Sequence, residues 1–90
     1  MKTTLEQPIC EVSPNGTKHW YLNDNLHRTD GPAIEYSDGE KHWYQNGKLH
    51  RIDGPAVIYP DGEKHWYLNG EKVTQQDIMN QNLLILFMII

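Results

Sequence analysis

The stretch "HRTDGPAIEYSDGEKHWYQN" at residues 27–46 is followed by "HRIDGPAVIYPDGEKHWYLN" at residues 50–69. The two segments are identical at 15 of 20 positions, with a period of 23 residues. A partial copy precedes them, because "KHWY" occurs at 18–21 as well as at 41–44 and 64–67. Self-similarity at a fixed period is typical of a repeat architecture, so the repeat is interpreted before any local propensity.

Asn-Gly and Asp-Gly dipeptides separate short runs that are rich in Tyr, Trp, Ile and Val. In a type I′ turn both central residues need positive φ, which Asn, Asp and Gly tolerate best. The sequence therefore predicts two-residue hairpin turns at five places, and a weaker turn at Asn23-Asp24. The five turns are Asn15-Gly16, Asp38-Gly39, Asn46-Gly47, Asp61-Gly62 and Asn69-Gly70.

The predicted turns set the register of the strands. Across Asp38-Gly39, Tyr36 is expected opposite Lys41 and Ile34 opposite Trp43. One face should then carry Ile34, Tyr36, Trp43, Val57, Tyr59 and Trp66, and the other Glu35, His42, Tyr44, His65 and Tyr67. A bulge or kink is expected at residues 53–55, and prolines at 32 and 55 should interrupt the long strands. The expected fold is mainly β, an antiparallel meander of repeated hairpins with about six strands over residues 1–73.

The repeat pattern ends after Asn69-Gly70, and the segment "VTQQDIMNQNLLILFMII" begins. Thr74 followed by Asp77 resembles a capping box, and apolar residues recur at helical spacing after it. The segment at 74–90 is therefore expected to form an apolar C-terminal helix from about 75 to 88, although Ile and Phe are also good strand formers. The helix should pack on the sheet or in the interface of a homo-oligomer. The candidate oligomerisation residues are Met79, Leu83, Leu86, Phe87 and Ile90.

Charge and cysteine content exclude several classes of protein. There are 8 Lys+Arg against 12 Asp+Glu, and a formal charge of -4 has the wrong sign for gripping a nucleic-acid backbone. Cys10 stands alone, so no intramolecular disulfide can form. The first ten residues lack the apolar core of a signal peptide, so the sequence predicts a cytoplasmic protein.

The histidines and the "HRTD" and "HRID" segments are the candidates for metal binding and catalysis. His19, His42 and His65 lie one repeat apart, and two strands of about 4.8 Å per repeat would separate neighbours by ~10 Å. That spacing cannot place them around one ion, so no metal site and no cofactor are expected. The "HRxD" segments resemble a protein-kinase catalytic loop without the rest of its machinery. Arg28 and Arg51 are instead expected to hold the kinked loops by reaching Asp30, Asp53, Glu35 or a nearby histidine.

Repetition places equivalent groups in rows, whereas an active site needs different groups that converge on one atom. The sequence therefore predicts no catalytic residues and a non-enzymatic surface that binds another protein. Its aromatic, arginine and apolar residues are typical of interface centres. The candidate partner-binding residues are His19, Tyr21, Leu26, Arg28, His42, Tyr44, Leu49, Arg51, His65 and Tyr67.

The unit "NGKLHRIDGPAVIYPDGEKHWYLNG" resembles a variant MORN repeat, in the "HRxDGPA" form associated with small bacterial and bacteriophage proteins. The resemblance covers roughly residues 15 to 73. It departs from the ordinary motif where that motif has His-Gly-x-Gly and this chain has "HRIDG" at 50–54. The resemblance implies a hairpin-built sheet, protein-protein contact, frequent self-association and a plausible action on a host protein.

Two alternatives remain open at this point. A dimer could enclose a nucleotide or similar anion between Trp, His and Arg side chains, and sequester it without turnover. The other alternative is a MORN-type protein that associates peripherally with a membrane through residues 83–90, although no basic residues flank that segment.

Overall fold

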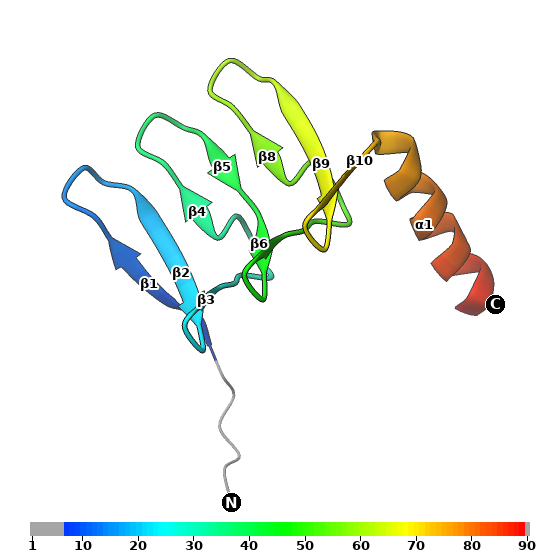
Figure 1. Cartoon of the computed structure of the whole chain (residues 1–90), viewed down its shortest axis with the longest axis horizontal. Helices are drawn as coiled ribbons and strands as arrows, with labels where there is room; N and C mark the ends of the chain where they lie inside the picture. The colour runs from blue at the N-terminus through cyan, green and yellow to red at the C-terminus, as the bar shows by residue number, and fades with distance from the viewer. Residues whose placement is uncertain (1–6, 90) are drawn as a thin grey trace, which may run out of the picture.

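The computed structural model of the chain describes residues 7–89, with side chains described for residues 7–82. Figure 1 shows hairpins lying side by side in an array, with the helix at the far end. The strands are β1 (Ile9–Val12), β2 (Lys18–Leu22), β3 (Asn25–Leu26), β4 (Ile34–Glu35), β5 (Lys41–His42), β6 (Tyr44–Gln45), β7 (Lys48–Leu49), β8 (Val57–Ile58), β9 (Lys64–Leu68) and β10 (Glu71–Val73). The helix is α1 (Gln75–Ile89). The predicted mainly β fold with a C-terminal helix is confirmed.

The strands form an antiparallel sheet in the order β1-β2-β4-β5-β8-β9-β10, with β3 paired to β2 and a separate pair of β6 with β7. The described residues contain ten short strands where about six were expected, because the loops at 27–33 and 50–56 interrupt them. The interruptions fall at the predicted Asp-Gly-Pro segments. The molecule measures 47 × 44 × 18 Å, so it is a thin slab.

Three of the predicted turns have the expected conformation. Asn46 and Asn69 have φ of 52° and 50°, and each is followed by a glycine with positive φ. Asn23 and Asp24 have φ of 52° and 67°, so the weaker turn is formed as well. Positive φ at both central residues is the signature of a type I′ turn, and each of these turns joins two strands in a tight hairpin.

The Asp38-Gly39 and Asp61-Gly62 turns differ from the prediction, because each hairpin loop has three residues. Tyr36 N–H donates to the carbonyl of Glu40 at 2.9 Å, and Gly39 N–H donates to the carbonyl of Tyr36 at 3.0 Å. Only the glycine has positive φ, and the Asp38 carboxylate accepts from Glu40 N–H at 2.9 Å. This is a type I turn followed by a left-handed glycine. The hairpin around Asn15-Gly16 has the same hydrogen bonds, from Ser13 to Thr17 and from Gly16 to Ser13.

The extra loop residue shifts the register by one, so the predicted face assignment is wrong. Ile34 lies opposite His42 and Val57 opposite His65, where Trp43 and Trp66 were expected. A shift of one residue moves every side chain of a strand to the other face. We call one side the His–Tyr face: His19, Tyr21, Leu26, Ile34, Tyr36, His42, Tyr44, Leu49, Val57, Tyr59, His65 and Tyr67. The other is the Trp–Lys face: Lys18, Trp20, Arg28, Ala33, Glu35, Lys41, Trp43, Arg51, Ala56, Ile58, Lys64 and Trp66.

The small core lies along two rows that cross the strands. On the Trp–Lys face, Ala33 and Ala56 are fully buried, and each is a cross-strand neighbour of two tryptophans. On the His–Tyr face, Ile34 and Val57 are 5% and 4% exposed between the histidines. Alanine leaves room for the large indoles on both sides, which explains why a small residue stands in the middle of the row.

Hydrogen bonds between successive units repeat with the 23-residue period. His27 Nδ1 accepts from the backbone N–H of Asn46 at 3.0 Å, and His50 Nδ1 accepts from that of Asn69 at 3.0 Å. Gly47 N–H donates to the Leu26 carbonyl at 2.9 Å, and the equivalent bond from Gly70 recurs one unit later. The I′ turns at Asn46-Gly47 and Asn69-Gly70 are therefore anchored to the preceding unit, and the array is held by contacts between neighbours.

The capping box predicted for α1 is present. Thr74 N–H donates to Asp77 Oδ2, and Asp77 N–H donates to Thr74 Oγ1, each at 3.0 Å. The helix stands beside the last hairpin (Figure 1), where Ile78 is 4% exposed. Ile78 lines a small cavity together with Trp66, and Asn82 Nδ2 donates to the carbonyl of Ile52 at 3.0 Å. The first half of α1 thus closes the end of the array.

Candidate functional site

Two arginines fold back over tryptophans on the Trp–Lys face. The Arg28 guanidinium carbon lies 3.8 Å from the centre of the Trp20 ring. Its Nε donates to Asp30 Oδ1 at 2.8 Å, and its Nη1 donates to the Pro32 carbonyl at 3.0 Å and to Glu35 Oε2 at 3.1 Å. A guanidinium held flat on an indole combines a cation–π contact with directional hydrogen bonds. We call residues 28–32 and 51–55 the arginine loops.

The second arginine loop repeats the first with one difference. Arg51 lies 3.9 Å from the Trp43 ring, and it donates to Asp53 Oδ1 at 2.8 Å and to the Pro55 carbonyl at 3.0 Å. The residue equivalent to Glu35 is Ile58, so Arg51 has no second carboxylate. The prediction that the arginines hold the kinked loops is confirmed, and the aspartates of the "HRxD" segments serve the loop geometry.

Glycine is required inside each arginine loop because the guanidinium lies against the backbone. A Cβ atom placed on Gly54 would lie 2.7 Å from Arg51 Cζ, and one on Gly31 would lie 2.9 Å from Arg28 Cζ. Either contact is too close for a carbon atom, so any side chain here would push the arginine off its tryptophan. The recurring Asp-Gly-Pro thus has a packing reason as well as a conformational one.

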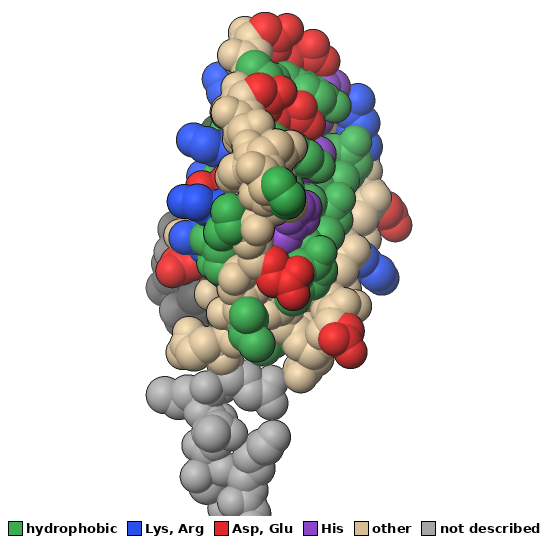
Figure 2. Space-filling model, turned by 90° about the vertical axis from the view of Figure 1, so that its left-hand side faces the viewer, with side chains coloured by type: hydrophobic (Ala, Val, Ile, Leu, Met, Phe, Trp, Pro, Cys, Tyr) green, Lys and Arg blue, Asp and Glu red, His purple; other side chains and the backbone are tan. Residues whose placement is uncertain are grey.

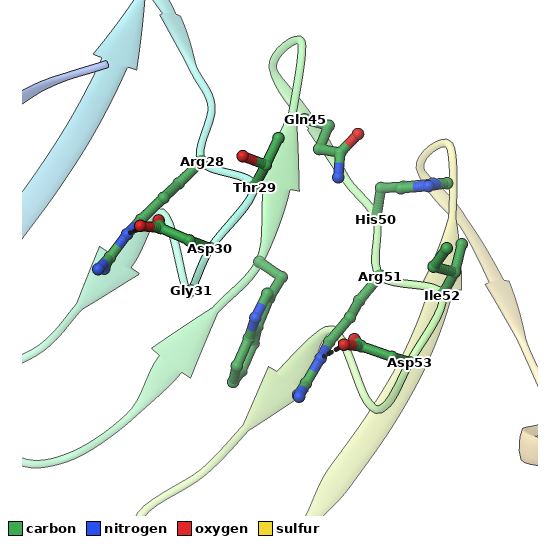
Figure 3. A pocket seen from close by; sticks show the side chains of 10 residues that line it. Arg28, Thr29, Asp30, Gly31, Gln45, His50, Arg51, Ile52 and Asp53 are labelled. Atoms are coloured by element: carbon green, nitrogen blue, oxygen red, sulfur yellow. Dashed lines mark hydrogen bonds and ion pairs between the residues drawn. The ribbon is translucent and has the colours of Figure 1, made fainter. Parts of the chain in front are cut away.

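A groove separates the two arginine loops (Figure 3), with a volume of about 490 Å³. Its walls are the Arg28–Gly31 and Arg51–Asp53 segments, and Trp43, Gln45 and His50 complete the lining. The Asp30 and Asp53 side chains are 83% and 81% exposed. The groove is therefore polar, and each of its positive charges is paired with a carboxylate.

The His–Tyr face consists of rows of aromatic rings. His19 stacks with Tyr21 at 6.2 Å between ring centres, and His42 stacks with Tyr44 at 6.4 Å. Tyr36 meets His42 edge to face at 5.1 Å. Figure 2, which looks at the slab from the β1 end, shows histidines following one another among hydrophobic side chains. The tyrosines at 21, 44 and 67 are half-buried, so their rings remain available to a partner.

Two histidines of this face are bonded to glutamates at the hairpin ends. His42 Nε2 lies 2.6 Å from Glu40 Oε2, and His65 Nε2 lies 2.7 Å from Glu63 Oε2. Because a carboxylate only accepts, the imidazole Nε2 carries the proton in both pairs. The first unit has Thr17 in place of the glutamate, and His19 has no such bond. These pairs fix the orientation of the His42 and His65 rings, which meet Tyr36 and Tyr59 edge to face.

Burial raises the pKa of the Tyr44 hydroxyl above its ordinary value, and the nearby Tyr67 raises that pKa further. The pKa of Tyr36 is raised first by burial and then by the Glu40 carboxylate. Both phenols therefore stay neutral across the physiological range, and each can donate as well as accept a hydrogen bond.

The structure brings together eight of the ten predicted partner-binding residues. His19, Tyr21, Leu26, His42, Tyr44, Leu49, His65 and Tyr67 share the His–Tyr face. Arg28 and Arg51 lie on the opposite face over the tryptophans, because each arginine is bonded to the aspartate and the proline carbonyl of its own loop there. They cannot contribute to the same contact surface.

Of the predicted oligomerisation residues, Met79 is 50% exposed at the start of α1. The predictions for Leu83, Leu86, Phe87 and Ile90 concern side chains outside the described residues. Within residues 7–89 the structure contains no helix that is long and apolar enough to cross a membrane.

His19, His42 and His65 form the spaced row that was predicted, since Ile34 lies between the first two and Val57 between the last two. Among the described residues no three His, Cys, Asp or Glu side chains are placed to hold a metal ion together.

Exposed residues that the sequence interpretation did not single out are Lys18, Lys41 and Lys64, which lie on the Trp–Lys face with the tryptophans. Their signal was visible in the recurring "KHWY", where Lys and Trp are two residues apart and so share a face of a strand.

The fold and its two faces define a repeat-built β protein with two extended surfaces. No family model, no curated protein and no solved structure matches the chain.

Proposed function

We propose that this chain is a non-enzymatic module that binds another protein through its His–Tyr face. The observation that carries the proposal is the row of half-buried tyrosines at 21, 44 and 67, which recurs once per unit beside Leu26 and Leu49. Tyrosine is enriched at interfaces because it offers large contact area with one polar end and little entropy to lose.

The repeated geometry supports binding over catalysis. The His–Glu pairs and the Arg–Asp pairs recur from one unit to the next, so they form rows and do not converge on one reacting atom. With the resemblance to MORN-type repeats of small bacterial and bacteriophage proteins, the proposal takes the form of an accessory protein in the cytoplasm that binds and modulates or inhibits a host protein.

The test is affinity capture from the source cell with the full chain as bait and quantitative mass spectrometry as the readout. The double variant Tyr44→Ala, Tyr67→Ala removes about 3 kcal/mol or more of contact and should deplete a true partner strongly. Ile52→Ala is the matched control, because Ile52 is 49% exposed on an arginine loop. Equal recovery of the same partner by the double variant and by wild type would place the binding surface elsewhere.

Self-association through the C-terminal segment is a second element of the proposal. The half-exposed Met79 and the apolar sequence after it support a helix that packs against a second copy. Light scattering on the full chain and on a chain ending at Asn82 should give a mass above one copy for the first and one copy for the second. Equal masses would show that the segment has no part in association.

A small anionic ligand is the alternative that one observation favours. The groove of about 490 Å³ has the size of a ligand pocket and brings Trp43, His50 and Arg51 together. Both arginines that line it are already paired with aspartates, so an anion would have to compete for them. A thermal-shift screen against nucleotides tests it, because a specific ligand raises the melting temperature by mass action.

A further inference from the structure

Three lysines form a ladder along the Trp–Lys face. Lys18 and Lys41 are the cross-strand neighbours of Glu35, and Lys41 and Lys64 are those of Ile58. All three lysines are exposed. Glu35 is bonded to Arg28, and no carboxylate in residues 7–82 forms an ion pair with any of the three ammonium groups. The ladder is therefore a row of positive charges on this face that are not ion-paired within residues 7–82.

The net charge of -4 is thus distributed unevenly between the faces. The glutamates at 40 and 63 are bonded to histidines of the opposite face, and the aspartates at 30 and 53 are bonded to arginines. An acidic protein that holds a row of lysines on one side attracts an acidic partner more strongly to that side.

The spacing of the ladder indicates the shape of the partner. One unit advances two strands at ~4.8 Å each, so successive lysines are about 9.6 Å apart across the strands. A polypeptide in the polyproline II conformation advances 3.1 Å per residue with three residues per turn, or ~9.3 Å per turn. Every third side chain of such a segment points the same way, so its repeat nearly equals the repeat of the ladder.

We propose that the Trp–Lys face binds an acidic, extended peptide segment that carries a carboxylate at every third residue. The segment runs along the array, across the strands, and each carboxylate meets one lysine. This site goes beyond the proposed protein-binding surface, because it lies on the opposite face and uses none of its residues.

A nucleic acid fits the face less well. Along the axis of a duplex each phosphate of one strand is advanced by only ~3.4 Å, so further phosphates lie between any two that reach successive lysines. The Asp30 and Asp53 carboxylates, 83% and 81% exposed, stand on the same face and would repel the phosphates between the lysine contacts. An acidic peptide with neutral residues between its carboxylates avoids that repulsion.

The two halves of the ladder differ, and the difference supplies an internal control. Glu35 stands between Lys18 and Lys41, whereas Ile58 stands between Lys41 and Lys64. The half without a carboxylate should attract the peptide more strongly. Ile58→Glu should therefore weaken binding, and Glu35→Ile should strengthen it by giving the first half the composition of the second.

The experiment measures binding of fluorescent peptides to the full chain by anisotropy. The probes are Glu-Pro-Pro repeats, which repeat every third residue, and Glu-Pro-Pro-Pro repeats of equal glutamate content. The three-residue period should bind roughly fivefold tighter, and each Lys→Ala change at 18, 41 or 64 should weaken it roughly two- to fivefold. Lys72→Ala is the matched control with the same loss of charge, since Lys72 lies opposite Tyr67 on the other face.

Equal affinity for the two peptides would overturn the proposal. It would show that the lysines attract acidic peptides whether or not the spacing of the carboxylates matches that of the lysines. Tighter binding of oligo(dT), or of vesicles containing phosphatidylserine, than of the Glu-Pro-Pro peptide would overturn it in favour of those partners. The lysines are exposed, and circular dichroism of each variant verifies that the fold is retained. Tyr44→Ala, Tyr67→Ala should leave peptide binding unchanged, so this site and the proposed protein-binding surface can fail separately.

Discussion

The chain covers its first two tryptophans and its third in different ways. After Trp20 and Trp43 it returns through an arginine loop, with a guanidinium flat on the ring. After Trp66 the position equivalent to Arg28 and Arg51 is Thr74, and the chain continues into α1. Ile78 then lines the cavity at Trp66 and is 4% exposed.

The comparison teaches that each indole of the repeat needs a covering side chain. The chemistry of that covering side chain can differ from one unit to the next. A cation held by a carboxylate and a carbonyl serves inside the array, where the next unit follows. An aliphatic side chain serves at the end, where no further unit follows and a helix can occupy the place of the missing arginine loop. Terminal units of repeat proteins are commonly atypical for this reason.

The largest effect is expected from filling the space beneath both kinds of cover. Ala56 is fully buried, with a relative exposure of 0%. It is the cross-strand neighbour of both Trp43 and Trp66. Ala56→Leu should lower the free energy of unfolding by about 1–3 kcal/mol through overpacking. Urea denaturation measures the loss, and Ile52→Leu on the exposed loop is the control. An unchanged midpoint would show that the Trp–Ala row is not close-packed.

Removing the aliphatic cover comes next. Ile78→Ala should cost about 1–2 kcal/mol, near the low end for a buried aliphatic residue, because one side of the site is open. The Trp66 emission should shift to the red as water reaches the indole. Gln81→Ala, at an exposed residue of the same helix, should leave both measurements nearly unchanged. Equal effects of the two variants would mean that α1 does not seal the array.

The two arginine loops should differ by a smaller amount. Arg28→Ala removes three hydrogen bonds and leaves Glu35 facing Lys18 and Lys41, whereas Arg51→Ala removes two. We expect losses of about 1 kcal/mol for each, with Arg28 the greater by a few tenths. Gly54→Ala should match Arg51→Ala in urea denaturation, because the added carbon displaces the guanidinium. An unchanged urea midpoint for Gly54→Ala would contradict the close approach of the Arg51 guanidinium to the backbone at Gly54.

The smallest effect concerns the start of α1. The backbone N–H of Thr74 donates to Asp77, which lowers the pKa of that carboxyl, and the Thr74 side chain lowers it further. A lowered folded-state pKa means that the cap contributes above pH ~4 and is lost as the pH falls through the folded value. Helix content by circular dichroism should follow this loss. Asp77→Asn should remove the pH dependence, and a persistent acid transition would assign it to another group.

The repeat is visible in the sequence itself, and the strands, the I′ turns at 23–24, 46–47 and 69–70 and the helix cap could be predicted because each depends on residues close together in sequence. The faces could not, because they depend on whether a loop has two residues or three. Pro14 and Pro60 carried the missing signal: proline fixes φ near -65°, which suits the first central position of a type I turn and excludes type I′ there.

The roles of the arginines were predictable in part. Charge complementarity within "HRTDGP" and "HRIDGP" was enough to pair each arginine with its aspartate. The position of the arginines over the tryptophans could not be predicted. It requires knowing that Lys, Trp and Glu35 share a face of the sheet. The Lys ladder was missed for the same reason, because its members are far apart in sequence and meet only through the register.

The thinness of the slab has a consequence for how the chain folds. With one dimension of only 18 Å and hydrogen bonds that join each unit to the next, stability is a sum over units and their junctions. Such a system behaves like a short one-dimensional Ising chain. A further 23-residue copy inserted between Leu49 and His50 would lengthen the slab by ~10 Å across the strands and add one junction between units. Both terminal units would stay as they are.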